Sequence, residues 1–168
     1  MDNILEKYWK DITDRTELSF PRFADEAVHT APVLAVLQNP GNSGAEKSGV
    51  CSLNNDDPTA KRTDRLMSEA GIIREQVIFW NFNAAYGKPY RNREFWVSEM
   101  GVLVSLLPNL RVLIAFGNEA WQGIRDVRLP ARVRLIGAPH PSNRSCNSKP
   151  RAEGLIADTW QRTKLLLG

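Results

Sequence analysis

The residues best suited to chemistry lie in one polar stretch, residues 138–145, with His140 at its centre. An imidazole titrates near neutral pH and can donate or accept a hydrogen bond, and Pro139 and Pro141 restrict the backbone on either side of it. The side chains that follow are suited to phosphate oxygens: Ser142, Asn143, Arg144 and Ser145. An ordinary turn could contain the same residue types, so the prediction of a site depends on a partner elsewhere in the chain.

Two further polar stretches begin where apolar runs end. The run over residues 33–38 stops at Asn39, and the run over residues 76–80 stops at Asn81. Continuous apolar runs are expected of strands that are covered on both faces, and a shorter run, residues 132–136, precedes His140. Because the carboxyl ends of parallel strands lie at one edge of a sheet, the three polar stretches are expected to meet there. This convergence favours a site at His140.

The order of the elements predicts an α/β fold. Strands are expected at residues 33–38, 76–80, 111–116 and 132–136, and helices at residues 2–10, 58–70 and 94–106, around Trp121, and at residues 150–167. This alternation is typical of a three-layer α/β/α arrangement around a central four-stranded parallel sheet. No linker or repeat interrupts the sequence, so residues 1–168 are expected to form a single domain.

Some details of these elements are also predicted. Asp57 is suited to cap the helix that Pro58 opens, and this capping role is favoured over a catalytic pairing with Asp56. Residues 39–57 are expected to be one long irregular loop, and such loops in compact domains are usually functional or disordered. Val50 and Leu53 could pack this loop down, which favours a functional one. The aromatic rings of Phe20 and Phe23 are expected to pack on the sheet, and Leu155 is expected on the buried side of the last helix.

The composition limits the class of protein. The chain has 168 residues, a formal net charge of +3 and a sequence pI of about 9.0, which is compatible with a polyanionic partner. Its two cysteines, Cys51 and Cys146, are too few for a disulfide scaffold or for an iron–sulfur cluster, which takes about four. With no apolar run long enough to span a membrane and no signal peptide, we expect a cytoplasmic monomer that uses neither a metal nor another cofactor.

Taken in order, these motifs resemble those of the uracil-DNA glycosylase superfamily. Gln38-Asn39-Pro40-Gly41 is similar to the first motif of that family, and residues 140–145 are similar to the second, the intercalation loop. Asn81 stands where the family has a base-reading asparagine at a strand end, and residues 112–118 are similar to its third strand and turn. The resemblance covers roughly residues 30–165 and implies a uracil-DNA glycosylase-like fold.

The resemblance implies a monofunctional DNA glycosylase of base excision repair, which flips a deaminated or damaged base out of DNA and hydrolyses its N-glycosidic bond. His140 would stabilise the oxyanion that develops on the departing base, and Asn39 would orient water. The implied base-binding residues are Gln38, Ser52, Asn81 and Phe82. The implied DNA-binding residues are Ser43, Ser142, Asn143, Arg144 and Ser145, with Arg144 filling the gap that the flipped base leaves.

Three features depart from the best-known branch of the family. That branch has an aspartate where this chain has Asn39, as in the mismatch-specific and single-strand-selective branches, and an amide cannot take a proton from water. The aromatic residue that stacks on the base is replaced by Ser52, with Phe82 or Tyr86 as possible substitutes. The wedge is Arg144 instead of an apolar residue. The substrate base is therefore open among uracil, hypoxanthine, xanthine and damaged pyrimidines.

Two other functions are compatible with the sequence. The chain could be a weakly active or inactive module that binds nucleic acid or a nucleotide on the same scaffold, or a hydrolase of free nucleosides. A binding module would bind labelled DNA without removing a base, so a turnover assay would distinguish the first alternative. DNA binding that weakens steeply with salt concentration would argue against the second. Among single residues, Asn39 and Asn81 could instead serve only the local backbone, and Lys88, Arg91 and Arg93 form a basic cluster typical of a solvated face.

Overall fold

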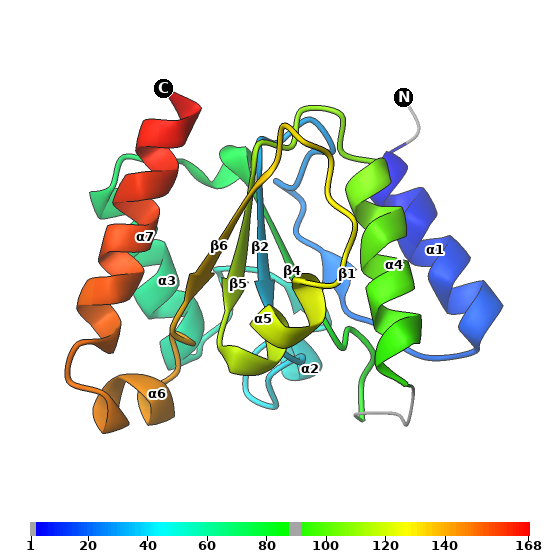
Figure 1. The fold of residues 1–168 in the computed structure, drawn as a ribbon. Helices are drawn as coiled ribbons and strands as arrows, with labels where there is room; N and C mark the ends of the chain where they lie inside the picture. The colour runs from blue at the N-terminus through cyan, green and yellow to red at the C-terminus, as the bar shows by residue number, and fades with distance from the viewer. Residues whose placement is uncertain (1–2, 88–91) are drawn as a thin grey trace.

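The computed structural model describes residues 3–87 and 92–168, and its centre is a four-stranded parallel sheet (Figure 1). The strands are β2 (Val33–Leu37), β4 (Val77–Asn81), β5 (Val112–Phe116) and β6 (Arg134–Ala138), in the spatial order β4-β2-β5-β6. The four predicted strands are confirmed within about two residues at each end. In this register Leu37 lies beside Asn81 and Phe116 lies beside Ala138, so the carboxyl ends of the strands are level.

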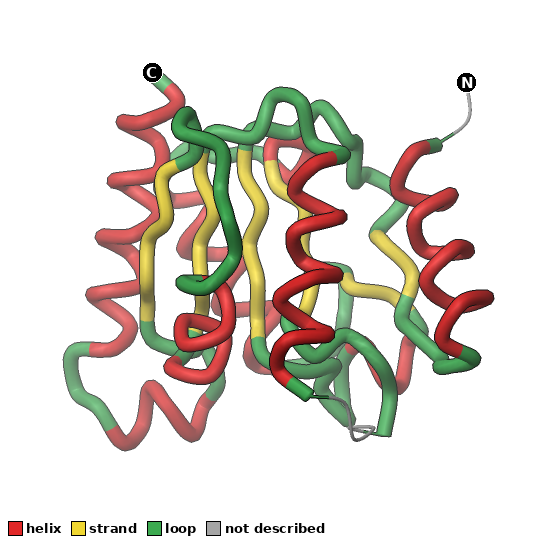
Figure 2. The backbone as a smooth tube through the Cα atoms, turned by 45° about the vertical axis from the view of Figure 1, so that its right-hand side comes forward, coloured by secondary structure: helices red, strands yellow, loops and turns green. Residues whose placement is uncertain are grey.

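Helices cover both faces of the sheet, which confirms the expected α/β/α layering (Figures 1 and 2). One face is covered by α3 (Pro58–Glu69) and α7 (Ala152–Leu167), and the other by α4 (Arg93–Ser105) and α5 (Asn118–Ile124), with α1 (Ile4–Thr16) on the same side as α4. A short 3₁₀ turn, η1 (Arg74–Gln76), leads into β4. None of the helices in the described ranges is long and apolar enough to cross a membrane.

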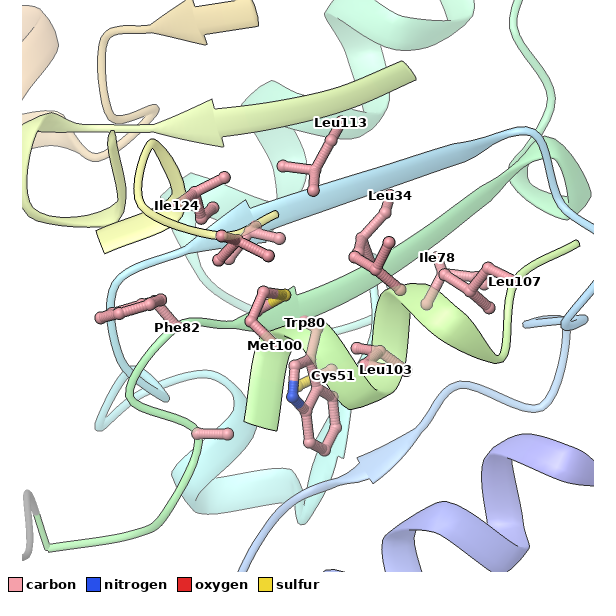
Figure 3. Packing of buried hydrophobic residues seen from close by; sticks show 14 of the residues in the cluster. Leu34, Cys51, Ile78, Trp80, Phe82, Met100, Leu103, Leu107, Leu113 and Ile124 are labelled. Atoms are coloured by element: carbon pink, nitrogen blue, oxygen red, sulfur yellow. The ribbon is translucent and has the colours of Figure 1, made fainter. Parts of the chain in front are cut away.

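Side chains of each strand alternate between the two layers of core. In β2, Leu34 and Val36 pack toward α4, whereas Val33 and Ala35 pack toward α3 and α7. Figure 3 shows the first of these layers, in which Leu34 of β2 lies among Leu113, Ile78 and Leu103. Because both faces are buried, the strands are apolar throughout, as the sequence indicated.

The expectation of one irregular loop over residues 39–57 is wrong. This segment contains a short helix, α2 (Ala45–Ser48), and a short strand, β3 (Val50–Cys51), which pairs in parallel with β1 (Arg22–Phe23). β1 in turn places Phe23 on Trp80, with ring centroids 4.1 Å apart, so the expected packing of Phe23 on the sheet is confirmed. A two-residue strand is too short to show any periodicity in the sequence.

No helix was expected between the fourth strand and the helix predicted at residues 150–167, and this expectation is also wrong. A separate helix, α6 (Asn143–Ser148), begins directly after Ser142, whose hydroxyl oxygen accepts a hydrogen bond from the backbone N–H of Ser145 at 3.3 Å. α6 has no buried residue, so it has no apolar stripe by which the sequence could reveal it. Two smaller corrections concern α1, which extends to Thr16, and Leu155, whose side chain is 50% exposed.

Candidate functional site

A cavity of about 350 Å³ opens at the carboxyl edge of the sheet, which is within the ordinary size range of small-molecule sites. Its walls come from the end of β2 and the segment that follows it, the end of β4, the first turns of α3, and the segment after β6. Eight of the residues singled out from the sequence line it: Asn39, Ser43, Ser52, Asn81, His140, Ser142, Asn143 and Arg144. The three predicted polar stretches therefore meet, as their positions after parallel strands required.

His140 is held in one tautomer by its own chain. The backbone N–H of Ser142 donates to its Nδ1 at 3.2 Å, so Nδ1 is the accepting nitrogen and the proton of the neutral ring is on Nε2. Burial lowers the pKa of His140, and the negative charge of Asp57 partly opposes this shift. The side chain is therefore a neutral imidazole at neutral pH, with an Nε2–H donor.

Asn81 is the buried polar residue at the end of β4 and is 5% exposed. Its Nδ2 donates to the Sγ of Cys51 at 3.4 Å. Burial raises the pKa of the Cys51 thiol to about 12, so the sulfur stays uncharged and acts as a weak acceptor. This contact holds the amide of Asn81 in one orientation and leaves its carbonyl oxygen available to a ligand.

Asn39 is fixed by the segment that follows β4. Its Oδ1 accepts from the Nδ2 of Asn83 at 3.1 Å, and the backbone N–H of Asn83 donates to the carbonyl of Gln38 at 2.9 Å. The pairing of β2 with β4 thus continues past the end of the strands. The amide nitrogen of Asn39 is left as the group that can donate to a molecule in the cavity.

Arg62 of α3 connects the His140 segment to the rest of the protein. Its guanidinium donates to the carbonyl of Pro141 at 2.6 Å, to Oδ1 of Asn143 at 3.0 Å and to the carboxylate of Glu153 at 3.1 Å. The side chain is only 16% exposed. A single guanidinium has enough donors in a fixed plane for all three contacts, so Arg62 holds the backbone next to His140 against α3 and α7.

The implied DNA-binding residues surround the mouth of the cavity. Ser43, Asn143 and Arg144 are exposed, and Ser142 and Ser145 are half-buried. The hydroxyl oxygen of Ser142 and the backbone N–H of Ser145 pair to cap α6, and Ser145 does not line the cavity. Within residues 3–87 and 92–168, the guanidinium of Arg144 has no ion-pair partner, so its charge faces solvent.

Two implied base-binding residues lie away from the cavity. Phe82 is buried beneath α5, where its ring would come within 2.2 Å of a Cβ added to Gly123, and Figure 3 shows it at the end of the core near Ile124. Gln38 donates from its side chain to Glu119 of α5. The proposed substitute Tyr86 does not line the cavity either, and its hydroxyl donates to the carbonyl of Ala45 at 3.4 Å.

The sequence analysis did not identify several residues of the cavity wall. Leu37, Leu53 and Phe79 supply apolar surface, and the carboxylate of Asp57 lines the wall beside the first turn of α3. Phe79 is one of two aromatic residues of this wall, with Trp80, although both belong to a strand. The apolar run did not indicate that the ring of Phe79 would reach the cavity. The alternation of side chains along a strand predicts on which face of the sheet a residue lies, but not which residues it packs against.

The other charged and metal-ligating candidates lie outside this site. Arg93 pairs with Asp126 at 2.5 Å, and Lys88 and Arg91 lie outside the described residues. Among the described residues, no three His, Cys, Asp or Glu side chains are arranged to hold a metal ion.

A scan against protein-family models found no match to this chain, and a search of curated proteins found no relative. The functional assignment therefore depends on the geometry of the cavity.

Proposed function

We propose that this protein is a monofunctional DNA glycosylase with a uracil-DNA glycosylase-like fold, which hydrolyses the N-glycosidic bond of a deaminated or damaged base flipped into the cavity. The observation that carries the proposal is the neutral imidazole of His140, whose Nε2–H can donate into a cavity that Asn81 and Asn39 also line. The match of these residues to the motifs of the uracil-DNA glycosylase superfamily supports the same proposal.

The chemistry required of such an enzyme agrees with these side chains. As the glycosidic bond breaks, negative charge develops on the base and positive charge develops on the sugar. The Nε2–H of His140 can stabilise an oxyanion on the base, and an uncharged donor fixed before the reaction costs no reorganisation. The amide of Asn81 offers both a donor and an acceptor to the base edge, and the N–H groups of Asn39 can hold a water.

The shape of the cavity suits a flat, partly polar ring. The apolar side chains of Leu37, Leu53 and Phe79 line it together with the polar groups of Asn39, Asn81 and His140. A base in duplex DNA can reach such a cavity only after extrusion from the stack. The exposed charge of Arg144 at the mouth suits contact with the DNA backbone or with the gap that an extruded base leaves.

The test is a base-excision assay on labelled oligonucleotides that contain uracil, hypoxanthine, xanthine or 5-hydroxymethyluracil, each paired and single-stranded. Alkali then cleaves the strand wherever a base has been removed. We expect cleavage with at least one of these substrates and a large loss of it in His140→Ala, with a His29→Ala protein as the matched control.

Two outcomes would contradict the proposal. DNA binding without any strand cleavage would favour a binding module on the same scaffold. Absence of both cleavage and DNA binding, with release of base from free nucleosides, would favour a nucleoside hydrolase, whose activity should depend little on salt.

A further inference from the structure

Asp57 uses only one of its two carboxylate oxygens to cap α3. Its Oδ1 accepts from the backbone N–H groups of Thr59 and Ala60 at 2.9 and 3.0 Å. For Oδ2, the described ranges contain no hydrogen-bond donor and no ion-pair partner. Capping alone does not require this second oxygen, because Ser, Thr or Asn would cap equally well.

The free oxygen is held at the cavity by the segment that follows β2. Gly44 lies so close that a Cβ added to it would be 2.6 Å from Oδ2, so any other residue at this position would displace the carboxylate. Gly44, Asp57 and His140 line the same cavity. The charge of Asp57 also acts on the imidazole of His140, so the two side chains lie close to each other at this cavity.

We propose that Asp57 is the general base of the hydrolysis, an inference that rests on the glycosylase function proposed above. The bond between C1′ and the base nitrogen breaks, and its electron pair leaves with the base, whose oxyanion accepts a hydrogen bond from His140. The oxygen of a water held by Asn39 bonds to C1′, and a proton of that water passes to Oδ2 of Asp57. Asp57 then releases this proton to solvent, and solvent supplies a proton to the base, so that the carboxylate and the neutral base are both restored. The negative charge of Asp57 also favours the positive sugar.

Asp57 thereby supplies the function that Asn39 cannot perform. The amide at the position of the first motif can orient water but cannot accept its proton, whereas the carboxylate of Asp57 can. Its position in the sequence, directly before a proline that opens a helix, indicates only a cap. The same side chain can serve both purposes because a carboxylate has two oxygens.

Asp56 provides a matched control. It is the preceding residue and carries the same charge, but its side chain is 88% exposed and pairs with Lys61 at 2.5 Å. It does not line the cavity. Asp56→Asn therefore removes one negative charge from the same region without touching the site.

The experiment compares Asp57→Asn with Asp56→Asn on the base that the wild-type protein excises. Asparagine keeps the cap of α3, so we expect an unchanged melting temperature for Asp57→Asn. Its single-turnover rate should fall by about 100-fold or more, the usual contribution of a general base. The Kd for DNA should stay the same or decrease, because the substitution removes a negative charge. Asp56→Asn should match the wild type in rate.

Each other result has a distinct meaning. If the wild type is active and Asp57→Asn is as fast as Asp56→Asn, Asp57 is only a cap and the inference is overturned. If the wild type excises no base, the proposed function fails and this inference fails with it. Should Asp57→Asn not fold, Asp57→Ser serves the same purpose, because serine also caps a helix and has no carboxylate.

Discussion

Gly117 lies directly behind His140. A Cβ added to Gly117 would be 3.2 Å from the Cβ of His140 and 3.5 Å from its Cδ2, and the backbone at Gly117 has a φ of 88°. The backbone N–H of Gly117 also donates to the carbonyl of Ala138 at 2.8 Å. The backbone of the turn after β5 thus packs against the side chain of His140. Only glycine, which has no side chain, allows the backbone to approach His140 this closely.

Gly117→Ala should therefore reduce the excision rate by more than the loss of folding stability alone explains. The backbone of Gly117, with a φ of 88° and a ψ of 162°, lies in a region essentially restricted to glycine and should cost alanine about 1–3 kcal/mol. The added methyl group must also shift His140. Gly71→Ala is the control, since Gly71 has a φ of 74° and a Cβ added to it would approach Lys164 no closer than 3.8 Å. Thermal unfolding should show that both variants are less stable than the wild type. Excision rates should show a loss of activity in Gly117→Ala that is larger than any loss in Gly71→Ala. Equal activities would mean that Gly117 does not position His140.

Arg62→Ala should impair excision without any direct contact between Arg62 and the base. The substitution releases the carbonyl of Pro141 and the side chain of Asn143, and a displacement of about 1 Å at a catalytic group can cost about 100-fold in rate. Arg65→Ala is the control, because Arg65 lies on the same helix and contacts Glu153 but not the His140 segment. A rate for Arg62→Ala as high as that of Arg65→Ala would contradict this role.

The imidazole of His140 should titrate below the ordinary histidine pKa of about 6.5, because burial disfavours its charged form. The chain has two histidines, so NMR of a His29→Gln protein reports His140 alone. The unfolded chain binds this proton more readily than the folded protein, so folding stability should decrease as the pH falls below about 6.5. This decrease should be smaller in His140→Gln. A titration midpoint at or above 6.5 would contradict the neutral imidazole.

Phe82→Leu should lower the stability of the protein, whereas Phe79→Leu should weaken substrate binding. Phe82 is buried under α5 against Gly123, so its substitution should cost about 1 kcal/mol or more of stability and leave the activity of the folded protein unchanged. Phe79 lines the cavity, so its substitution should weaken substrate binding by roughly tenfold through lost aromatic contact with the base. Unfolding curves and Kd measurements distinguish the two, and a binding defect in Phe82→Leu would return that residue to the site.

Arg144→Ala should reduce activity on duplex DNA more than on single-stranded DNA. An extruded base leaves a gap only in a duplex, and Arg144 is exposed at the mouth of the cavity. The salt dependence of DNA binding should also decrease in slope by about 1. The control for a general charge effect is Lys149→Ala. Lys149 is also exposed and lies at the C-terminal end of α6, whereas Arg144 lies in its first turn. An equal loss on both kinds of DNA would exclude the wedge role.

The sequence by itself determined the sheet and the edge at which the site forms. Continuous apolar runs predicted the four strands, and the cap and proline at Asp57 and Pro58 predicted the start of α3, because these signals are local to the chain. The same runs placed Asn39, Asn81 and His140 together, since parallel strands end at a common edge.

Only the tertiary structure decided which side chains face the cavity. Arg62 reaches Pro141 over 79 residues of chain, and Phe82, just past a strand end, packs beneath a helix that lies far ahead in the sequence. The second oxygen of Asp57 has no hydrogen-bond donor among the described residues, and Gly44 leaves room for it. Periodicity reports whether a residue is buried, but the identity of its neighbours depends on how separate elements pack.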